Sequence, residues 1–387
     1  MRRATGFSLL EVVIAMALTT TIAACVFGLM HPALGAFATE PEVADMQQRL
    51  RVAVDALTQD LAAAGAGAYL GDRTGPLIHF FAPVLPFRKD LSGDDPIGTV
   101  RTDTVTTIAV PATAAQTTLA ADLLPGALTV EAVAEPGCPA GTYLCGFSPG
   151  MTVAVYDDAG SVGLFSVAAV ADSMRQITLA GRPVDSSSTI YRSGSSIVHV
   201  SVHTLSLKSD AATQTFQLRH GDGSGVDVPV VDHLVRLAFD YYAEPRPPTM
   251  MARVASYGPA PPPIDVQTTG YPAGENCVFQ IDQVTGEPMS RLAPLAGGSG
   301  LVPLTAAQLA DGPWCPDETA VNRWDADLLR IRAIDITVRV EAALAALRGP
   351  AGVLFTNAGV STSPSRWAPD QEIRWRVSPR NLNLGRQ

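Results

Sequence analysis

The feature that most constrains the fold is an apolar run at the start of the chain, residues 7–30, in which Glu11 is the only charged residue. At about 1.5 Å per residue, a helix of this length crosses a hydrocarbon core of about 30 Å with some tilt. Arg2 and Arg3 precede the run, and positive flanks stay on the cytoplasmic side, so the rest of the chain is expected outside the cytoplasm. A carboxylate in lipid is costly and usually marks function, so Glu11 needs an explanation.

Two interpretations give Glu11 no special role. The first is a cleaved secretory signal, with a small-x-small cut site at Ala36, Phe37 and Ala38, but the run exceeds the roughly 7–15 apolar residues usual for such signals. The second is a plain transmembrane anchor in which Glu11 lies near the interface, where snorkelling lowers its cost.

A third interpretation accounts for every residue of the segment. The hexapeptide that starts at Gly6 resembles the processing site of type IV pilins and type II secretion pseudopilins: a short basic leader, Gly before the cut, an apolar residue after it, and Glu as the fifth mature residue. The residues that carry the resemblance are Gly6, Phe7, Ser8, Leu9, Leu10 and Glu11.

The resemblance implies that a prepilin peptidase cuts between Gly6 and Phe7 and that Phe7 is then N-methylated. It also implies partners: other pilin or pseudopilin subunits, bound through the N-terminal helix, and an inner-membrane assembly platform. The chain would be a single-pass inner-membrane protein with a cytoplasmic N-terminus before assembly. Afterwards it would belong to a cell-surface pilus or a periplasmic pseudopilus.

The same resemblance explains the carboxylate. Cleavage creates a cationic amine on Phe7, and Glu11 can meet the amine of a neighbouring subunit when helices pack with a stagger. Such a pair is strong away from water, and a subunit out of register would leave two unpaired charges. Glu11 is therefore predicted to be an assembly residue.

Beyond the anchor, apolar residues recur every three or four positions, which predicts an amphipathic helix packed on a globular domain. Its stripe consists of Val43, Met46, Leu50, Val54, Leu57 and Leu61. Pro32 is expected to kink or interrupt the helix, with a restart at Thr39 or Glu40 before Pro41. Gly65 or Gly67 is expected to end it.

From about residue 75 the pattern has a period of two, typical of strands separated by turns. Strands are predicted at residues 104–110, 127–134, 151–156, 163–170, 176–179, 197–207, 215–219, 234–242, 334–340 and 373–377. Short helices are predicted only at residues 305–310 and 342–347. The predicted fold class is α+β: one long N-terminal helix packed on a mostly antiparallel β head. The predicted parts are a leader (1–6), a transmembrane helix (7–31), its amphipathic continuation (32–67) and the head (68–387), with a Pro/Gly-rich insertion at about 243–325.

The cysteines indicate an oxidising compartment. Cys25 lies in the apolar run, and the other four lie in loops without the tight spacing or nearby histidines of a metal site. Disulfides between Cys138 and Cys145 and between Cys277 and Cys315 are predicted, although four reduced, buried thiols remain the alternative.

No catalytic pattern stands out in the sequence, so an enzyme is not expected. The formal net charge of −10 argues against a nucleic-acid partner. Residues 220–225 are interpreted as a glycine-rich loop, and His199 with His203 as ordinary strand residues instead of metal ligands. No cofactor is expected, with calcium the one ion left open. Its candidate ligands are Asp157, Asp158, Asp222, Asp227 and Asp232, which are more simply solvated turn residues.

Size then separates the pilin-like possibilities, because bulky heads crowd a helical array. A head this large suits a minor pilin at or near a tip, where it would prime assembly or adhere to a surface. The order of features resembles PilW-like minor pilins, loosely in the head, at residues 47–65, 151–167, 328–340 and 372–384. A type II secretion pseudopilus tip, and a membrane-anchored periplasmic enzyme or binding module, remain alternatives.

Overall fold

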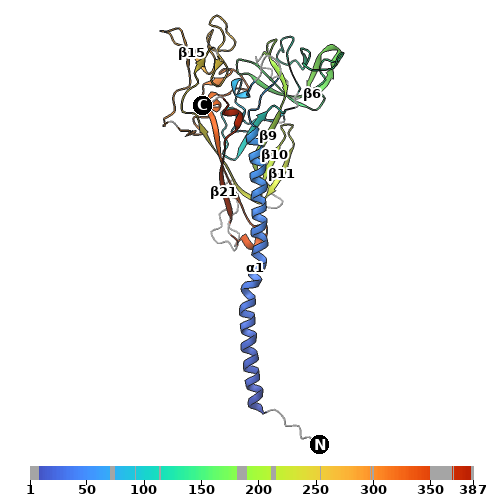
Figure 1. Cartoon of the computed structure of the whole chain (residues 1–387), viewed down its shortest axis with the longest axis vertical. Helices are drawn as coiled ribbons and strands as arrows, with labels where there is room; N and C mark the ends of the chain where they lie inside the picture. Colours follow the sequence, from blue (N-terminus) through green and yellow to red (C-terminus); the bar gives the residue numbers. More distant parts are fainter. Residues whose placement is uncertain are drawn as a thin grey trace.

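One long helix carries a β-rich head at its C-terminal end, and the N-terminal end of the helix lies far from the head (Figure 1). The computed structural model describes residues 8–69, 75–91, 93–112, 115–180, 190–210, 215–252, 254–296, 298, 300–348, 368 and 370–384, without the side chains of residues 31–38. Strand pairs in this described part are antiparallel. The α+β prediction is confirmed.

Helix α1 (Leu9–Ala63) is continuous over 55 residues. The interruption at Pro32 and the restart near Pro41 were therefore wrongly predicted, because α1 runs through both prolines. A proline removes one bond of the helical ladder and can bend a helix without ending it, since the bonds on either side persist. The helix ends just before Gly65, whose φ of +80° suits glycine and whose N–H donates to the Ile108 carbonyl at 3.0 Å.

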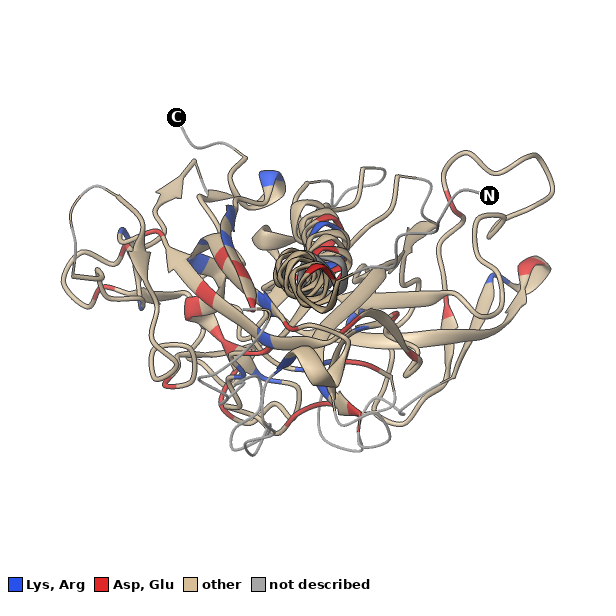
Figure 2. Cartoon of the chain, turned by 90° about the horizontal axis from the view of Figure 1, so that it is seen from below, with Lys and Arg blue, Asp and Glu red and all other residues tan. Residues whose placement is uncertain are grey.

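Two antiparallel sheets pack against helix α1. The five-stranded sheet has the order β1 (Val84–Leu85), β2 (Thr104–Ala109), β9 (Ser201–Asp210), β10 (Thr215–Gly221), β11 (Asp227–Asp232). The four-stranded sheet has the order β17 (Val302–Pro303), β12 (Leu234–Ala243), β20 (Ile331–Val340), β21 (Gln371–Val377). Helix α1 packs against β2 and β11 of the first sheet and against β20 and β21 of the second. Seen along the helix, α1 lies against one face of the head (Figure 2).

A third sheet forms a separate lobe. Its six strands have the order β3 (Gln116–Thr118), β8 (Ser196–His199), β5 (Thr152–Tyr156), β6 (Val162–Ala171), β7 (Gln176–Ala180), β4 (Thr129–Glu131). The predicted turn at residues 157–160 joins β5 to β6, and Gly160 has a φ of +95°. This lobe has its own hydrophobic core, distinct from the core that buries α1.

The segment predicted to be an insertion, residues 243–325, folds into small hairpins beside the four-stranded sheet. They are β13 (Met250–Met251) with β14 (Val254–Ala255), β15 (Phe279–Ile281) with β16 (Pro288–Ser290), and β18 (Trp314–Cys315) with β19 (Trp324–Asp325). Short 3₁₀ helices complete the head: η1 (Leu77–His79), η2 (Asp172–Met174), η3 (Ala326–Arg330), η4 (Ala345–Arg348) and η5 (Arg380–Leu382).

The predicted strands overlap observed ones, but both short helices were wrongly predicted. Residues 305–310 form only turns, although Thr305 and Gln308 make the reciprocal hydrogen bonds of a helix start. Gly312 and Pro313 follow too soon for a helix to extend. Residues 342–347 overlap only the short 3₁₀ helix η4.

Candidate functional site: the N-terminal helix and its junction with the head

The first described residues form a complete helix cap. Ser8 donates to Glu11 Oε2 from its backbone N–H (2.8 Å) and its hydroxyl (3.0 Å), and the Glu11 N–H donates back to Ser8 Oγ at 3.3 Å. Glu11 is therefore a capping-box residue within its own chain. The Ser-x-x-Glu spacing signals this box, but the sequence analysis missed it. Gly6 and Phe7 lie outside the described residues.

The first part of helix α1 is fully exposed. Leu9–Met30 is long and apolar enough to cross a membrane, with a mean hydropathy of 2.3 and 0% of it buried. Three hydroxyls here, of Thr19, Thr20 and Thr21, donate to carbonyls one turn earlier in the helix. They therefore need no water, which suits a segment in lipid or among other helices. Cys25 also lies on this exposed surface.

The second part of α1 belongs to the head. Met46, Leu57 and Leu61 of the predicted stripe are fully buried, and the other three members are partly buried. Polar bonds reinforce this packing. Trp375 donates to Thr58 Oγ1 at 3.1 Å, and Asn381 donates to the carbonyl oxygens at the end of the helix, those of Ala63 and Ala64.

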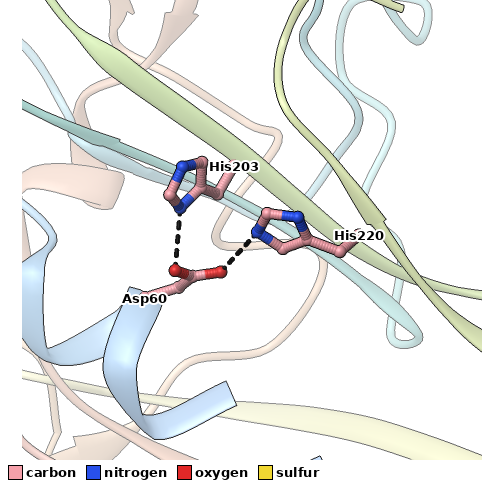
Figure 3. Close-up of side chains that lie close together, drawn as sticks. All are labelled: Asp60, His203 and His220. Atoms are coloured by element: carbon pink, nitrogen blue, oxygen red, sulfur yellow. Dashed lines mark hydrogen bonds and ion pairs between the residues drawn. The ribbon is translucent and has the colours of Figure 1, made fainter. Parts of the chain in front are cut away.

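An acid and two histidines converge where α1 meets the five-stranded sheet (Figure 3). Asp60 accepts hydrogen bonds from His203 Nδ1 on β9 at 2.8 Å and from His220 Nε2 on β10 at 2.9 Å, through different carboxylate oxygens. Burial by itself raises the pKa of Asp60, but the two histidine hydrogen bonds outweigh it and lower that pKa to about 2. The bond to Asp60 raises the pKa of His220.

This triad was not predicted from the sequence. His199 and His203 were considered together, but His199 ends β8 of the six-stranded sheet and His203 lies on β9 of another sheet. His220 is the penultimate residue of β10, not part of a loop as predicted. One signal was available: Asp60 sits beside the apolar stripe, between Leu57 and Leu61, where a carboxylate needs partners.

Three of the five aspartates considered for calcium bond to protein groups that the structure describes. Asp157 accepts from the N–H groups of Ala159 and Ser161 in its hairpin turn, both at 2.9 Å. Asp222 accepts from Ser224, and Asp227 pairs with Arg88 at 3.1 Å. Asp157 and Asp222 thus bond to the N–H groups of their own turns, and Asp157 is partly buried there, not solvated.

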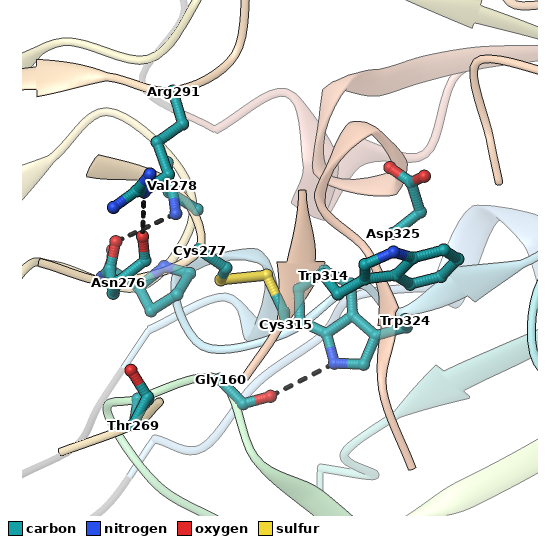
Figure 4. Close-up of a disulfide and its surroundings, with 12 residues drawn as sticks. Gly160, Thr269, Asn276, Cys277, Val278, Arg291, Trp314, Cys315, Trp324 and Asp325 are labelled. Carbon is teal, nitrogen blue, oxygen red and sulfur yellow. Dashed lines mark hydrogen bonds between the residues drawn. A yellow bond between two sulfur atoms is a disulfide. The ribbon is translucent and has the colours of Figure 1, made fainter. Parts of the chain in front are cut away.

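Both predicted disulfides are present, Cys138–Cys145 in the six-stranded lobe and Cys277–Cys315 in the hairpin region. Figure 4 shows the second beside Trp324, whose indole N–H donates to the Gly160 carbonyl at 3.1 Å. The hairpin region is thereby joined to the β5–β6 turn.

A cavity of about 260 Å³ is lined by Trp314 and Trp324, the two strand neighbours of Cys315. Its lining combines aromatic and charged side chains, among them Phe87, Lys89, Trp314, Arg323, Trp324 and Asp325. Pockets that mix aromatic surface with a few charged groups are typical of small-molecule sites. Burial raises the pKa of Asp325 to about 7.

Comparisons with known proteins bear on the N-terminus. Residues 1–24 match the family described as "Prokaryotic N-terminal methylation motif". A search of curated proteins finds no match. The match includes Gly6, Phe7 and Glu11, and it overlaps the exposed apolar part of α1. The chain therefore carries the N-terminal methylation motif of type IV pilin-like and pseudopilin substrates of prepilin peptidase, on a helix suited to a single-pass membrane anchor.

Proposed function

We propose that this protein is a minor pilin-like structural subunit, incorporated into a type IV pilus or a related filament and lying at or near its tip. The observation that carries the proposal is the division of α1. Its motif-bearing part, Leu9–Met30, has 0% of its length buried, while its C-terminal part is built into the head. A helix that is apolar on all sides must be surrounded either by lipid or by several neighbouring helices. In a filament core, neighbouring helices take the place of the lipid.

The capping box suggests how the Glu11 carboxylate is bonded both in the free subunit in the membrane and in the assembled filament. In the isolated chain, Glu11 is held by Ser8, so a subunit in the membrane has no unpartnered acid at this point. Cleavage after Gly6 would create an amine on Phe7. A neighbour's cationic amine is a stronger partner for Glu11 than a neutral hydroxyl, so packing in register would draw Glu11 from the cap to the charge pair.

The size and attachment of the head support a minor position. Three sheets and the hairpin region extend to both sides of the end of α1 (Figures 1 and 2). Repeating so broad a head at every step of a helical array would cause collisions, whereas one copy at a tip meets none. At a tip the head would prime assembly or present an adhesive surface, in a pilus or in a type II secretion pseudopilus.

A second candidate function is a membrane-anchored binding module, favoured by the cavity of about 260 Å³ beside Trp314 and Trp324. In this case the head would act by itself and the helix would serve only to hold it at the membrane. The two candidates differ in whether the mature chain is found in filaments.

Mass spectrometry of purified filaments tests the proposal. We expect a mature chain that starts at N-methylated Phe7, at far lower copy number than the main subunit. Gly6→Leu should leave an uncut precursor in the membrane, while Ala4→Leu in the same leader should be processed normally. A mature chain starting at Thr39, or a processed chain found only in the membrane fraction, would count against the filament role.

A further inference from the structure

The triad of Asp60, His203 and His220 gathers three potential metal ligands from three separate elements (Figure 3). Asp60 lies in the last turn of α1, and the histidines lie on the paired strands β9 and β10. His220 is opposite Leu205, two residues from His203, so the two imidazoles are diagonal neighbours on one face of the sheet. Their ring centroids are 4.7 Å apart.

The distances are those of a ligand set. Zinc bound at about 2.0–2.1 Å by nitrogen and oxygen in a tetrahedron separates its ligand atoms by about 3.3 Å. The two imidazole nitrogens lie 2.8 and 2.9 Å from the carboxylate oxygens of Asp60, and the three ligand atoms lie within 4.8 Å of one another. Shifts of no more than about 1.5 Å, within the reach of the part-exposed imidazole side chains, would therefore bring the three ligand atoms to this spacing.

Burial and charge at the triad also suit a cation. The side chain of Asp60 is 10% exposed, whereas those of His203 and His220 are 33% and 25% exposed. The anionic ligand is thus enclosed, while the imidazole side is open to an ion and to a water molecule. Asp222 and Asp227 add negative charge near His220, although Arg88 neutralises part of it by pairing with Asp227.

We propose that Asp60, His203 and His220 bind a divalent transition-metal ion of the zinc class, with water in the fourth position, and that this ion fastens the end of α1 to the five-stranded sheet. Two imidazoles and a carboxylate suit zinc and its neighbours better than calcium or magnesium, which prefer oxygen ligands. The site is independent of the filament role and would stiffen the junction between helix and head in either candidate function.

Metal binding requires a defined change in the two rings. Without metal, His203 Nδ1 and His220 Nε2 carry the hydrogens that they donate to Asp60. With metal, these nitrogens supply lone pairs, so each hydrogen moves to the opposite ring nitrogen. The ion then replaces two hydrogen bonds with three coordinate bonds across the same junction.

The test uses the full-length chain in detergent micelles, stripped of metal with a chelator and then titrated with Zn²⁺. We expect the chain to retain about one zinc ion after gel filtration and to melt at a higher temperature in its presence. His203→Ala with His220→Ala should weaken zinc binding by at least about tenfold. The matched control is His199→Ala, since His199 is a partly buried strand histidine outside the triad, and it should bind zinc like the unaltered chain.

Footprinting with diethyl pyrocarbonate decides the matter without any variant. Zinc should protect His203 and His220 of the unaltered chain from modification and leave His199 unchanged, as read by peptide mass spectrometry. The proposal is overturned if the unaltered chain retains no zinc. It is equally overturned if the added zinc protects neither triad histidine, or if the double variant binds zinc as tightly as the unaltered chain.

Discussion

Both parts of α1 are helical, but one is exposed and the other is packed into the head. In Leu9–Met30, apolar side chains surround the helix and 0% of the segment is buried, whereas in residues 39–63 they form one stripe that the head covers. A stripe can be covered by a single domain, but an apolar surface on every side requires lipid or several helices. The distribution of apolar residues around the helix, more than their number, therefore separates the anchor from the core.

Polar groups show the same division. Before Met30 they bond within the helix, as Glu11 does with Ser8 and the threonines do with carbonyls one turn earlier. After residue 39 they bond to the head, as Arg49 does with the Glu341 carbonyl and Asp60 does with two strands. The first part of α1 makes its polar bonds within the helix, and the second part makes them to the head. Substitutions in the second part should therefore change head stability, and substitutions in the first part should not.

The largest expected effect concerns covalent cross-links. Cys277→Ser with Cys315→Ser opens a loop with a sequence separation of 38 residues, so the free energy of unfolding of the head should fall by about 3–4 kcal/mol. Cys25→Ser in the exposed part of α1 is the control and should leave it unchanged. Denaturant titration followed by tryptophan fluorescence measures both. Equal values for the two variants would remove the distinction between anchor and head.

A matched pair of leucines tests packing directly. Leu57→Ala should destabilise the head by about 3 kcal/mol, since Leu57 is fully buried in the main core and its truncation leaves a cavity. Leu18→Ala removes the same atoms from the exposed part of α1 and should change head stability by less than about 0.5 kcal/mol. The same titration compares them, and a cost above 1 kcal/mol for Leu18→Ala would mean that the anchor packs on the head.

A buried carboxylate gives the head a pH dependence that the anchor does not share. Burial raises the pKa of Asp325 to about 7, so the folded head binds a proton that the unfolded chain has released. The contribution of Asp325 to stability should therefore fall by about 2.6 kcal/mol as pH rises from about 5 to 8.

Asp325→Asn is the control for this pH dependence. The two side-chain oxygens of Asp325 accept from the N–H groups of Gly312 (2.7 Å) and Asp327 (2.8 Å), and both oxygens can still accept when the carboxyl is protonated at pH 5, whereas an amide has a single oxygen. We therefore expect this variant to be less stable at pH 5 but to lose the decline between pH 5 and 8. A decline that persists in the variant would assign it to another group.

Some of the molecule could be predicted from the sequence, and the reason lies in the range of the interactions. The apolar run, the stripe at residues 43–61 and most strands follow from local periodicity. The disulfide pairs followed from the grouping of four loop cysteines into two local pairs, Cys138 with Cys145 and Cys277 with Cys315. The triad could not be predicted, because Asp60 meets His203 and His220 from 143 and 160 residues away. His199 belongs to another sheet, and the register between β9 and β10 makes His203 the diagonal neighbour of His220.

The smallest effect on the head should come from Glu11→Ala, which alters only the anchor. Glu11 is bonded only to Ser8 among the described residues, so its loss should weaken the first turn of α1 and leave the unfolding of the head unchanged. Processing should continue, because the cut lies between Gly6 and Phe7. Incorporation should fail, however, because the neighbour's amine would lose its counter-charge in an apolar bundle.

Quantitative mass spectrometry of sheared filaments and of membranes measures how much of the Glu11→Ala chain is incorporated and how much stays in the membrane. Glu11→Asp, which keeps the charge on a shorter side chain, should restore part of the incorporation. If Glu11→Ala were found in filaments at the level of the unaltered chain, the anchor would be a membrane span and nothing more, and the binding-module interpretation of the head would gain.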